Sequence, residues 1–340
     1  MRISITAVLT ALLVMTGCGP SPTGDGTPGT ETIRVAYVTN GIDPFWSIAE
    51  AGAMAAAEEL GVSCEVLMPP RGLVDQTQMV ESLLARNIDG IAISPIDAAN
   101  QVDLINEAAA RTVVITQDSD APDSDRLCFI GMDNYLAGRQ AGQLVKEAMP
   151  DGGSVMIFVG RLEQLNAQQR RQGVIDELLD RPVGDTHDLA FDPPGFTHLE
   201  GKYPIIGTRT DNFDYARAKA NAEDAMASHP DLGCMVGLFA YNIPNCLEAV
   251  KAAGRTGEIK LVSFDEADET LEGIRDGHVQ GTISQQPYEY GYQSVVVLKA
   301  LIEGDDSVIP EDGFIDIASI VVTRDNVDAF QAELDELRGG

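Results

Sequence analysis

The chain has 340 residues, and its 53 acidic against 23 basic residues give a formal net charge of −30. Nucleic-acid backbones are bound by concentrated Lys and Arg, so this charge argues strongly against a nucleic-acid partner and is interpreted as a source of solubility. The apolar share of 44% is that of a globular protein, and the chain after residue 32 is long enough for two domains of ordinary size.

The N-terminus has the pattern of an export signal. Arg2 precedes the apolar run 3–15, which is too short to span a bilayer comfortably and indicates the hydrophobic part of a secretory signal. Small residues and Cys18 follow it, a pattern that resembles the bacterial lipobox with Met15 where Leu is usual. In a lipobox the cysteine carries lipid and becomes the first mature residue.

These features predict where the protein resides. We expect residues 1–18 to be a lipoprotein signal peptide ending in a lipidated Cys18. The stretch 19–32 is rich in Gly, Pro, Thr and Ser and predicts a flexible tether. The protein would then be exported, periplasmic and anchored to the membrane by lipid. The alternative is a plain signal peptide followed by a disordered start.

Short β-branched runs alternate with amphipathic stretches along the first half of the body. We expect strands at 33–39, 62–68, 88–94, 111–117 and 127–132. We expect helices between them at 46–60, 74–87 and 98–110. Continuous apolar strands separated by helices are typical of a parallel sheet covered on both faces.

The same pattern then starts again. Strands are expected at 153–160, 203–209, 232–239, 259–265 and 279–285. Helices are expected at 134–148, 165–180, 213–228, 244–253 and 287–302. Two successive sets predict an α/β protein of two similar, doubly wound lobes. Such sheets bind ligands at the carboxyl ends of their strands, where the strand order switches.

Polar and aromatic side chains gather at those strand ends. They are Thr39, Asp43, Phe45, Trp46, Ser94, Asp118, Asn242, Asp265 and Gln285. Any one of the polar residues could be an ordinary helix cap, because Asp, Asn and Ser favour that position. Their recurrence in both halves of the chain favours a ligand site between the lobes.

Cysteines and histidines give no metal motif. Cys64, Cys128, Cys234 and Cys246 lie in apolar sequence and are expected to be buried free thiols, although spacing alone does not fix disulfide connectivity. One segment combines two histidines with carboxylates, and we interpret it as a solvated loop rather than a metal site. Its residues are Asp185, His187, Asp188, Asp192, His198 and Glu200. No metal and no cofactor are predicted.

Seven stretches, taken in order, resemble one known family. They are VTNGIDPFW (38–46), ISPID (93–97), VVITQD (113–118), GMDNYLAGRQAG (131–142), NAQQRRQG (166–173), VSFDE (262–266) and ISQQPYEYG (283–291). From residue 33 to about 325 the chain resembles the periplasmic sugar-binding proteins of ABC transporters, whose type member is ribose-binding protein. These motifs are specific to the family and much less specific to a ligand.

The resemblance implies the type I periplasmic binding protein fold, two Rossmann-like lobes joined by a three-crossing hinge. The first lobe would comprise 33–132 plus 286–318, and the second 133–285 plus 319–336. Crossings would fall near 132–134, 285–287 and 318–320. A hinged capture protein of this kind usually acts as a monomer.

The resemblance also assigns roles to residues. Phe45 and Trp46 would form an aromatic wall that covers the apolar face of a sugar, opposed by Phe213 from the second lobe. Hydroxyls both donate and accept, so the site needs acceptors and donors. Asp118 and Asp265 would accept and Arg170 would donate. Asn166, Asn242 and Gln285 would do either, and Thr39, Asp43 and Ser94 complete the set.

Three positions depart from the ribose-binding pattern and argue against ribose as the ligand. Ser119 stands where that pattern has Arg, and Asp43 and Ser94 each stand where it has Asn. The segment 180–202 has no equivalent in the short ribose-type proteins. Its Pro and Gly content predicts a surface loop, near enough to the second lobe to touch ligand or transporter.

The function implied is capture without chemistry. A sugar or similar polyol would bind between the lobes and be delivered to a membrane permease. A receptor that passes the signal to a membrane kinase or chemoreceptor would have the same site. An enzyme that hydrolyses a glycoside with Asp118 and Asp265 is a further alternative. It is disfavoured because 39–46 contains no nucleophile elbow, phosphate loop or dinucleotide fingerprint. A sugar-responsive repressor is excluded because residues 1–32 contain no basic helix-turn-helix.

Overall fold

The computed structural model describes residues 32–184 and 189–338, which contain two separate six-stranded sheets. The predicted lipidation site Cys18 lies outside the described residues, as do Asp185, His187 and Asp188. Among the described helices, none is long and apolar enough to cross a membrane. The prediction of two α/β lobes is confirmed.

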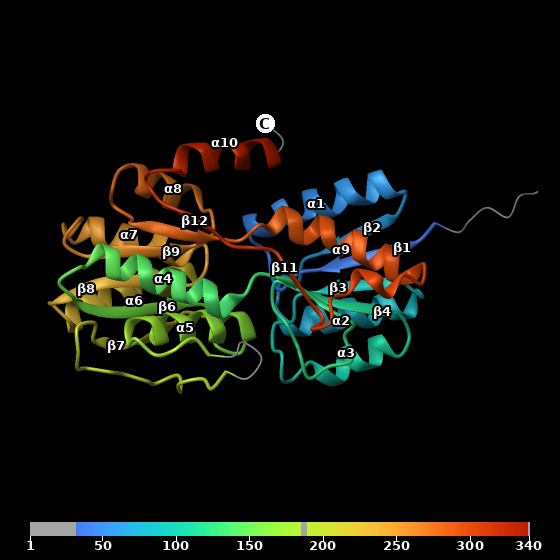
Figure 1. Cartoon of the computed structure of the whole chain (residues 1–340), viewed down its shortest axis with the longest axis horizontal. Coiled ribbons are helices and arrows are strands. Elements are labelled where there is room, and N and C mark those ends of the chain that lie inside the picture. The colour runs from blue at the N-terminus through green and yellow to red at the C-terminus, as the bar shows by residue number, and fades with distance from the viewer. Residues whose placement is uncertain (1–31, 185–188, 339–340) are drawn as a thin grey trace, which may run out of the picture. The chain divides into compact units, whose positions relative to one another are not determined.

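The first sheet has the strand order β11-β5-β4-β3-β1-β2, and all its pairs are parallel. Its strands are β1 (Arg34–Val38), β2 (Ser63–Leu67), β3 (Gly90–Ile93), β4 (Val113–Gln117), β5 (Phe129–Gly131) and β11 (Phe314–Asp316). Its helices are α1 (Pro44–Leu60), α2 (Leu73–Ala85), α3 (Val102–Ala109) and α9 (Pro287–Ile302). Helices α1 and α9 cover one face, and α2 and α3 cover the other (Figure 1).

The second sheet has the order β12-β10-β9-β8-β6-β7, with β12 antiparallel to β10. Its strands are β6 (Ser154–Val159), β7 (Ile205–Thr210), β8 (Leu232–Gly237), β9 (Lys260–Phe264), β10 (Gly281–Ser284) and β12 (Ile320–Val322). Its helices are α4 (Asn134–Ala148), α5 (Leu165–Leu178), α6 (Tyr215–Ser228), α7 (Asn242–Ala252), α8 (Asp268–Arg275) and α10 (Val327–Leu337). A short 3₁₀ turn, Asp306–Val308, follows α9 in the first lobe.

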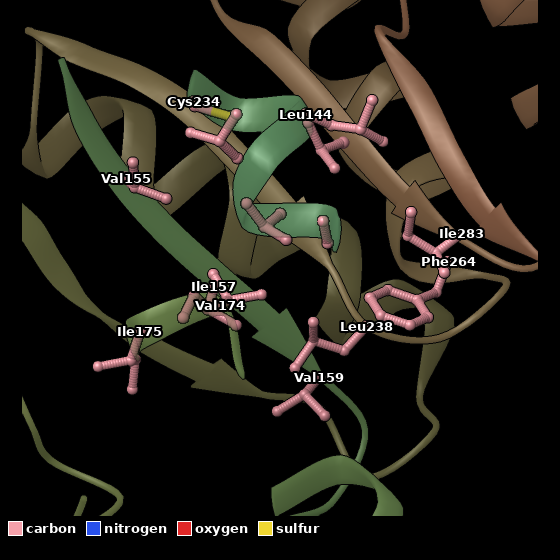
Figure 2. Packing of buried hydrophobic residues seen from close by; sticks show 14 of the residues in the cluster. Leu144, Val155, Ile157, Val159, Val174, Ile175, Cys234, Leu238, Phe264 and Ile283 are labelled. Atoms are coloured by element: carbon pink, nitrogen blue, oxygen red, sulfur yellow. The ribbon is translucent and has the colours of Figure 1, made fainter. Parts of the chain in front are cut away.

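Strand β6 shows why the strands are continuously apolar. Val155, Ile157 and Val159 point into the core beneath α4 and α5 (Figure 2), while Met156 and Phe158 point into the opposite core. Alternate side chains of a strand face opposite sides of its sheet, so a sheet covered on both faces needs apolar residues at every position. The carboxyl ends of these strands are left free for polar groups.

Short and terminal elements were not expected from the sequence. Helix α8 and strands β11 and β12 have eight, three and three residues, too few for a clear periodic pattern. The chain passes from one sheet to the other between β5 and α4, between β10 and α9, and between β11 and β12.

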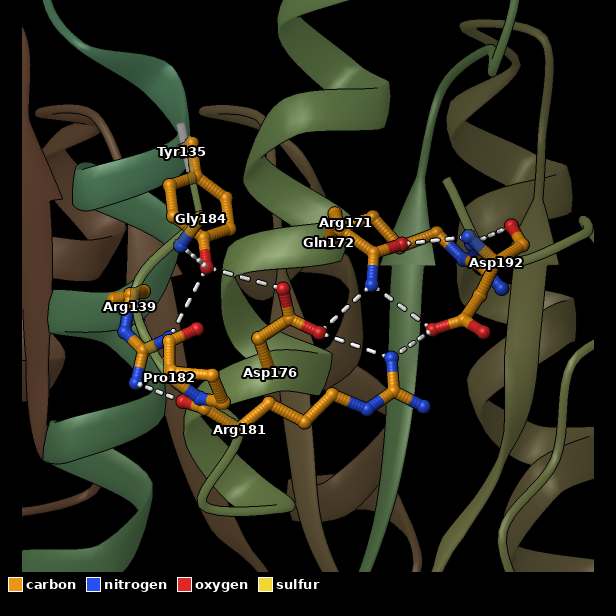
Figure 3. Close-up of polar contacts among 9 residues, drawn as sticks. All are labelled: Tyr135, Arg139, Arg171, Gln172, Asp176, Arg181, Pro182, Gly184 and Asp192. Atoms are coloured by element: carbon orange, nitrogen blue, oxygen red, sulfur yellow. Dashed lines mark hydrogen bonds and ion pairs between the residues drawn. The ribbon is translucent and has the colours of Figure 1, made fainter. Parts of the chain in front are cut away.

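The inserted segment 180–202 is tied to α5 by polar contacts (Figure 3). The carboxylate of Asp192 pairs with Arg181 at 2.6 Å and accepts from Gln172 at 2.9 Å. The guanidinium of Arg171 donates to the carbonyls of Asp192 and Pro193, both at 2.8 Å. Asp192 is therefore engaged with cations of its own lobe, and the described part of the segment is held against the second lobe.

The four cysteines of the described chain are unpaired, as expected. Cys128, Cys234 and Cys246 are buried, and Cys64 is half-buried. Burial raises the pKa of the Cys64 thiol to about 12 and that of Cys128 to about 11. These thiols remain protonated at neutral pH and are accordingly unreactive.

Each lobe contains one close helix crossing that depends on glycine. In the first lobe, a Cβ on Gly52 of α1 would collide with the carbonyl oxygen of Tyr288 in α9. In the second, a Cβ on Gly173 of α5 would collide with the carbonyl oxygen of Tyr135 in α4. Backbones this close admit only hydrogen at the contact. The crossing of α4 and α5 fixes the helix that carries Arg170.

We predict that Gly173→Ala lowers the free energy of unfolding by about 1–3 kcal/mol, because the added methyl group forces the two helices apart. Gly195→Ala is the matched control, since no atom lies within 4 Å of its added Cβ. Urea unfolding of both variants measures the difference. Equal stability of the two variants would contradict the close crossing.

Candidate functional site

A cavity of about 400 Å³ lies between the two lobes, at the carboxyl ends of their strands. Both lobes supply its walls. Nine of the twelve predicted site residues line it: Asp43, Phe45, Trp46, Asp118, Asn166, Arg170, Phe213, Asp265 and Gln285. The rule that ligands bind where parallel strands end therefore identifies most of this wall.

Asp118 and Asp265 occupy matching positions in the two lobes. Each follows the last residue of a strand, β4 or β9, and each has a left-handed backbone, with φ of 60° and 65°. Each still donates its backbone N–H to the next strand, to Ile130 or to Ile283. Non-glycine residues rarely adopt this conformation, and it recurs where function requires an unusual side-chain direction. Here both residues line the cavity.

Arg170 is the most completely buried charge on the wall, with 1% of its surface exposed. Its Nε donates to Oδ1 of Asn134 at 2.9 Å, and its Nη1 donates to the carbonyl of Leu238 at 3.0 Å. Its guanidinium carbon lies 5.0 Å from the ring centroid of Phe264 and 5.6 Å from that of Phe239. Nη2 has no acceptor among the described residues. The side chain is therefore fixed, with one donor left unused.

The two carboxyl groups share the charge of this one guanidinium. Burial raises the pKa of Asp118, and the positive charge of Arg170 and the hydroxyl of Ser94 oppose that rise. Burial also raises the pKa of Asp265, again opposed by Arg170, while the charges of Asp118 and Asp43 add to the rise. The positive charge of Arg170 therefore opposes the rise in pKa of both buried carboxyl groups.

Two hydrogen bonds link the lobes across the cavity. Nδ2 of Asn166 donates to Oδ2 of Asp118 at 3.4 Å, and the hydroxyl of Tyr215 donates to Oδ2 of Asp43 at 3.2 Å. Oδ1 of Asn166 is buried without a donor among the described residues. The site thus presents an unused donor on Arg170 and an unused acceptor on Asn166.

Three predicted residues lie behind the wall. Thr39 donates its hydroxyl to the carbonyl of Gly41 at 2.7 Å. Ser94 donates to Oδ2 of Asp118 at 2.8 Å. Asn242 donates to Oδ2 of Asp211 at 3.0 Å. All three are buried, and none lines the cavity, so their polar groups orient the wall instead of facing a ligand.

The helix that carries this aromatic pair begins two residues before the predicted start at 46. Pro44 and the N-cap Asp43 start α1 earlier, so both aromatics belong to its first turn, and both are buried. Trp46 packs edge-on against Phe45, with ring centroids 4.9 Å apart. The two rings belong to the hydrophobic core of the first lobe and also line the cavity. Phe213 lies on the second lobe's side of the cavity and stacks on Phe239 at 5.5 Å.

Several wall residues escaped the sequence analysis. They are Asn40, Arg161, Gln164, Tyr215, Phe239 and Tyr241, together with apolar residues at the rim. Asn40 is the immediate neighbour of the predicted Thr39. Arg161 and Gln164 follow β6, the one early strand of the second lobe whose end had not been considered. Applying the strand-end rule there would have found both.

The chemistry of the wall suits hydroxyl groups. Carboxylates accept, a guanidinium donates in a fixed plane, and amides do either. Among residues 32–184 and 189–338, no cluster of three or more His, Cys, Asp or Glu side chains could hold a metal. Aromatic rings from both lobes offer flat apolar surfaces beside these polar groups.

Asp211 supports the aromatic side of the cavity from behind. Its carboxylate accepts from the hydroxyl of Tyr241, from Nδ2 of Asn242 and from the backbone N–H of Phe213. Burial nevertheless raises the pKa of Asp211 to about 6. The folded protein therefore holds this proton more tightly than the unfolded chain does.

The sign of the pH dependence follows from this raised pKa. The folded state loses stability as pH rises through about 4 to 6, because it binds the proton that the unfolded chain has released. We predict that wild type loses about 1 kcal/mol relative to Asp211→Asn between pH 5 and pH 7.5. Urea unfolding at the two pH values measures this difference, with the exposed Asp151→Asn as control. Parallel pH profiles of wild type and Asp211→Asn would refute the raised pKa.

Comparison with known proteins places this geometry among binding proteins. The model of the periplasmic binding protein domain matches residues 33–306. A D-ribose/D-allose-binding protein of Pseudomonas aeruginosa is 25% identical over 333 residues, covering 93% of this chain and 97% of that protein. A ribose import binding protein of Salmonella typhimurium is 25% identical over 268 residues, covering 77% of this chain and 82% of its own.

Solved structures show the same arrangement. An ABC transporter solute-binding protein from Burkholderia graminis, crystallised with D-arabinose, superposes with a TM-score of 0.76 at 28% identity and covers 86% of this chain and 96% of its own. A glucose-galactose binding protein from Geobacillus stearothermophilus gives a TM-score of 0.77 at 26% identity, covering 87% and 99%.

Proposed function

Because the chain belongs to the periplasmic binding protein family, we propose that it captures a sugar between its lobes and delivers it to an ABC transporter permease. One observation carries this proposal. Nη2 of Arg170 and Oδ1 of Asn166 are buried on the wall of one cavity and have no partner in the part of the chain that the structure describes. A buried polar group without a partner destabilises the protein, and a ligand hydroxyl would satisfy both.

The wall suggests a role for each group. Arg170 donates through Nη2, while Asp118 and Asp265 accept from hydroxyls on either side of it. Gln285 donates to Oδ1 of Asp265 at 2.8 Å and holds that carboxylate in place. Asn166 completes the polar set through its free oxygen. The names of the relatives mention the aldoses ribose, allose, arabinose, glucose and galactose and the ketose tagatose, and we take a monosaccharide as the ligand class.

Binding would favour the closed arrangement. The bonds Asn166–Asp118 and Tyr215–Asp43 already join the lobes in this structure. A sugar that bonds to both lobes adds to them, and the shift toward closure equals its difference in affinity for the closed and open forms. The closed monomer would then present both lobes to the permease. The family is one of binding proteins, and no covalent step is needed for this function.

We predict that the purified protein is stabilised by a monosaccharide and that Arg170→Met abolishes the effect. A ligand at a hundred times its dissociation constant stabilises the folded form by about 2.7 kcal/mol, which a thermal-shift screen of sugars, polyols and amino acids detects. Arg217→Met is the control, because Arg217 is exposed on α6 and does not line the cavity.

Circular dichroism of the ligand-free variants shows whether Arg170→Met still folds. If it does not, Asn166→Ala removes the free acceptor without taking away the buried charge. Unchanged stabilisation by sugar in a folded Arg170→Met or Asn166→Ala protein would contradict the assigned site. Stabilisation by an amino acid alone would overturn the sugar assignment.

We further propose that the exported protein is anchored by lipid on Cys18. The support is the apolar run 3–15 followed by small residues and a cysteine. Expressed in a bacterium, the wild-type chain is expected in the membrane fraction and the detergent phase. Cys18→Ser is expected in the aqueous phase or as unprocessed precursor. Phase partition of both forms decides this, and a wild-type protein that is wholly aqueous would refute the anchor.

A further inference from the structure

The outer end of the cavity contains an arginine without an acidic partner. Arg161 follows β6, lines the cavity, and lies with its guanidinium carbon 5.0 Å from the ring centroid of Phe213. Among residues 32–184 and 189–338, its side chain has no ion-pair partner and no hydrogen-bond partner. In a chain with 53 acidic residues against 23 basic ones, a guanidinium left facing a cavity requires an explanation.

Its neighbours add positive potential. Gly72 lies across the cavity in the first lobe, where a Cβ would come 3.5 Å from Nη1 of Arg161. Gly72 is the N-cap of α2, and no side chain caps that helix. Gln164 is likewise the N-cap of α5 without a side-chain cap. Both helix N-termini carry partial positive charge, and a cation beside them is unfavourable unless an anion lies between.

Gln164 independently indicates a missing ligand. It is 1% exposed and lines the same cavity, yet its Oε1 has no partner among the described residues. Since the oxygen and nitrogen of an amide can be exchanged by rotation, this group can present a donor or an acceptor. A buried amide left unpartnered beside Arg161 is a polar group that a ligand would satisfy.

Two carboxylates of the first lobe have other partners. Both oxygens of Asp43 accept hydrogen bonds, Oδ1 from the backbone N–H of Phe45 at 3.0 Å and Oδ2 from Tyr215. Asp75, in the first turn of α2, pairs with Arg71. Neither carboxylate forms an ion pair with Arg161.

The two arginines of the cavity lie on one wall. The guanidinium of Arg161 lies over the ring of Phe213, and this ring stacks on Phe239. The guanidinium of Arg170 in turn lies over Phe239. This run of side chains connects the buried Arg170 to the partly exposed Arg161. A single ligand could therefore contact both guanidinium groups.

We propose that Arg161, with Gln164 and the N-terminus of α2 at Gly72, binds an acidic group on the sugar, a carboxylate or a phosphate. The ligand class is thus an anionic sugar, an inference that rests on the proposed sugar-binding function. The sugar ring contacts Arg170, Asp118 and Asp265, and its acidic substituent reaches Arg161. Because Arg161 and Gly72 belong to different lobes, the anion also bridges them and favours closure.

Isothermal titration of the purified protein with matched ligands tests this. The ligands are D-glucose, D-glucuronate and glucose phosphorylated at its primary hydroxyl, with the corresponding D-ribose and D-galactose series. We expect one acidic member to bind about tenfold to a hundredfold more tightly than its neutral parent, the range of a hydrogen-bonded charge pair. Comparison of the carboxylate and phosphate members identifies which acid is preferred.

Arg161→Gln should abolish this preference, because the variant lacks the positive charge that binds the acidic group. Arg324→Gln, an exposed arginine that does not line the cavity, should leave it intact. Neutral sugars that bind as tightly as their acids would overturn the acidic-group subsite and leave the sugar-binding function standing. A preference that survives Arg161→Gln would also overturn it. Failure of every sugar, neutral and acidic, would overturn both.

Discussion

The burial of Arg170 in one cavity wall with Asp118 and Asp265 is the constraint on which this site depends. A guanidinium with 1% of its surface exposed is tolerated only if charges and hydrogen bonds surround it. Asp118 and Asp265 supply the charges from matching strand ends, and Asn134 and Leu238 accept two of its hydrogen bonds. Its Nη2 has no acceptor among the residues that the structure describes. The same balance that stabilises the buried ion leaves one donor for a ligand.

The rest of the fold fixes the positions of these charged groups. Arg170 lies on α5, whose position is set by a backbone contact with α4 at Gly173. The two aspartates adopt a left-handed backbone directly after a strand, so each sheet directs one carboxylate to the gap between the lobes. Since the two sheets are joined by three chain crossings, the carboxylates move with their lobes. The site is complete only when both lobes contribute.

Much of this was accessible from the sequence, and the failures have physical reasons. Asp118 and Asp265 could be found because apolar runs end abruptly before them, and parallel strands end at one edge. Thr39, Ser94 and Asn242 satisfy the same rule but donate to groups within their own lobe, a difference of side-chain direction that periodicity does not encode. The start of α1 was predicted two residues late, at 46, because Pro44 takes the first helical position and Asp43 caps it. The unpartnered state of Arg161 and Gln164 emerges only when charges far apart in the chain are placed in space.

A crystal structure of the protein with the sugar that binds most tightly tests most directly whether Arg170 binds the ligand between the lobes. We expect a sugar between the lobes, with one of its oxygens at about 2.7–3.2 Å from Nη2 of Arg170. Further hydroxyls of the sugar should donate to the carboxylates of Asp118 and Asp265. A sugar bound elsewhere, or one between the lobes with Nη2 of Arg170 still unpartnered, would contradict this expectation.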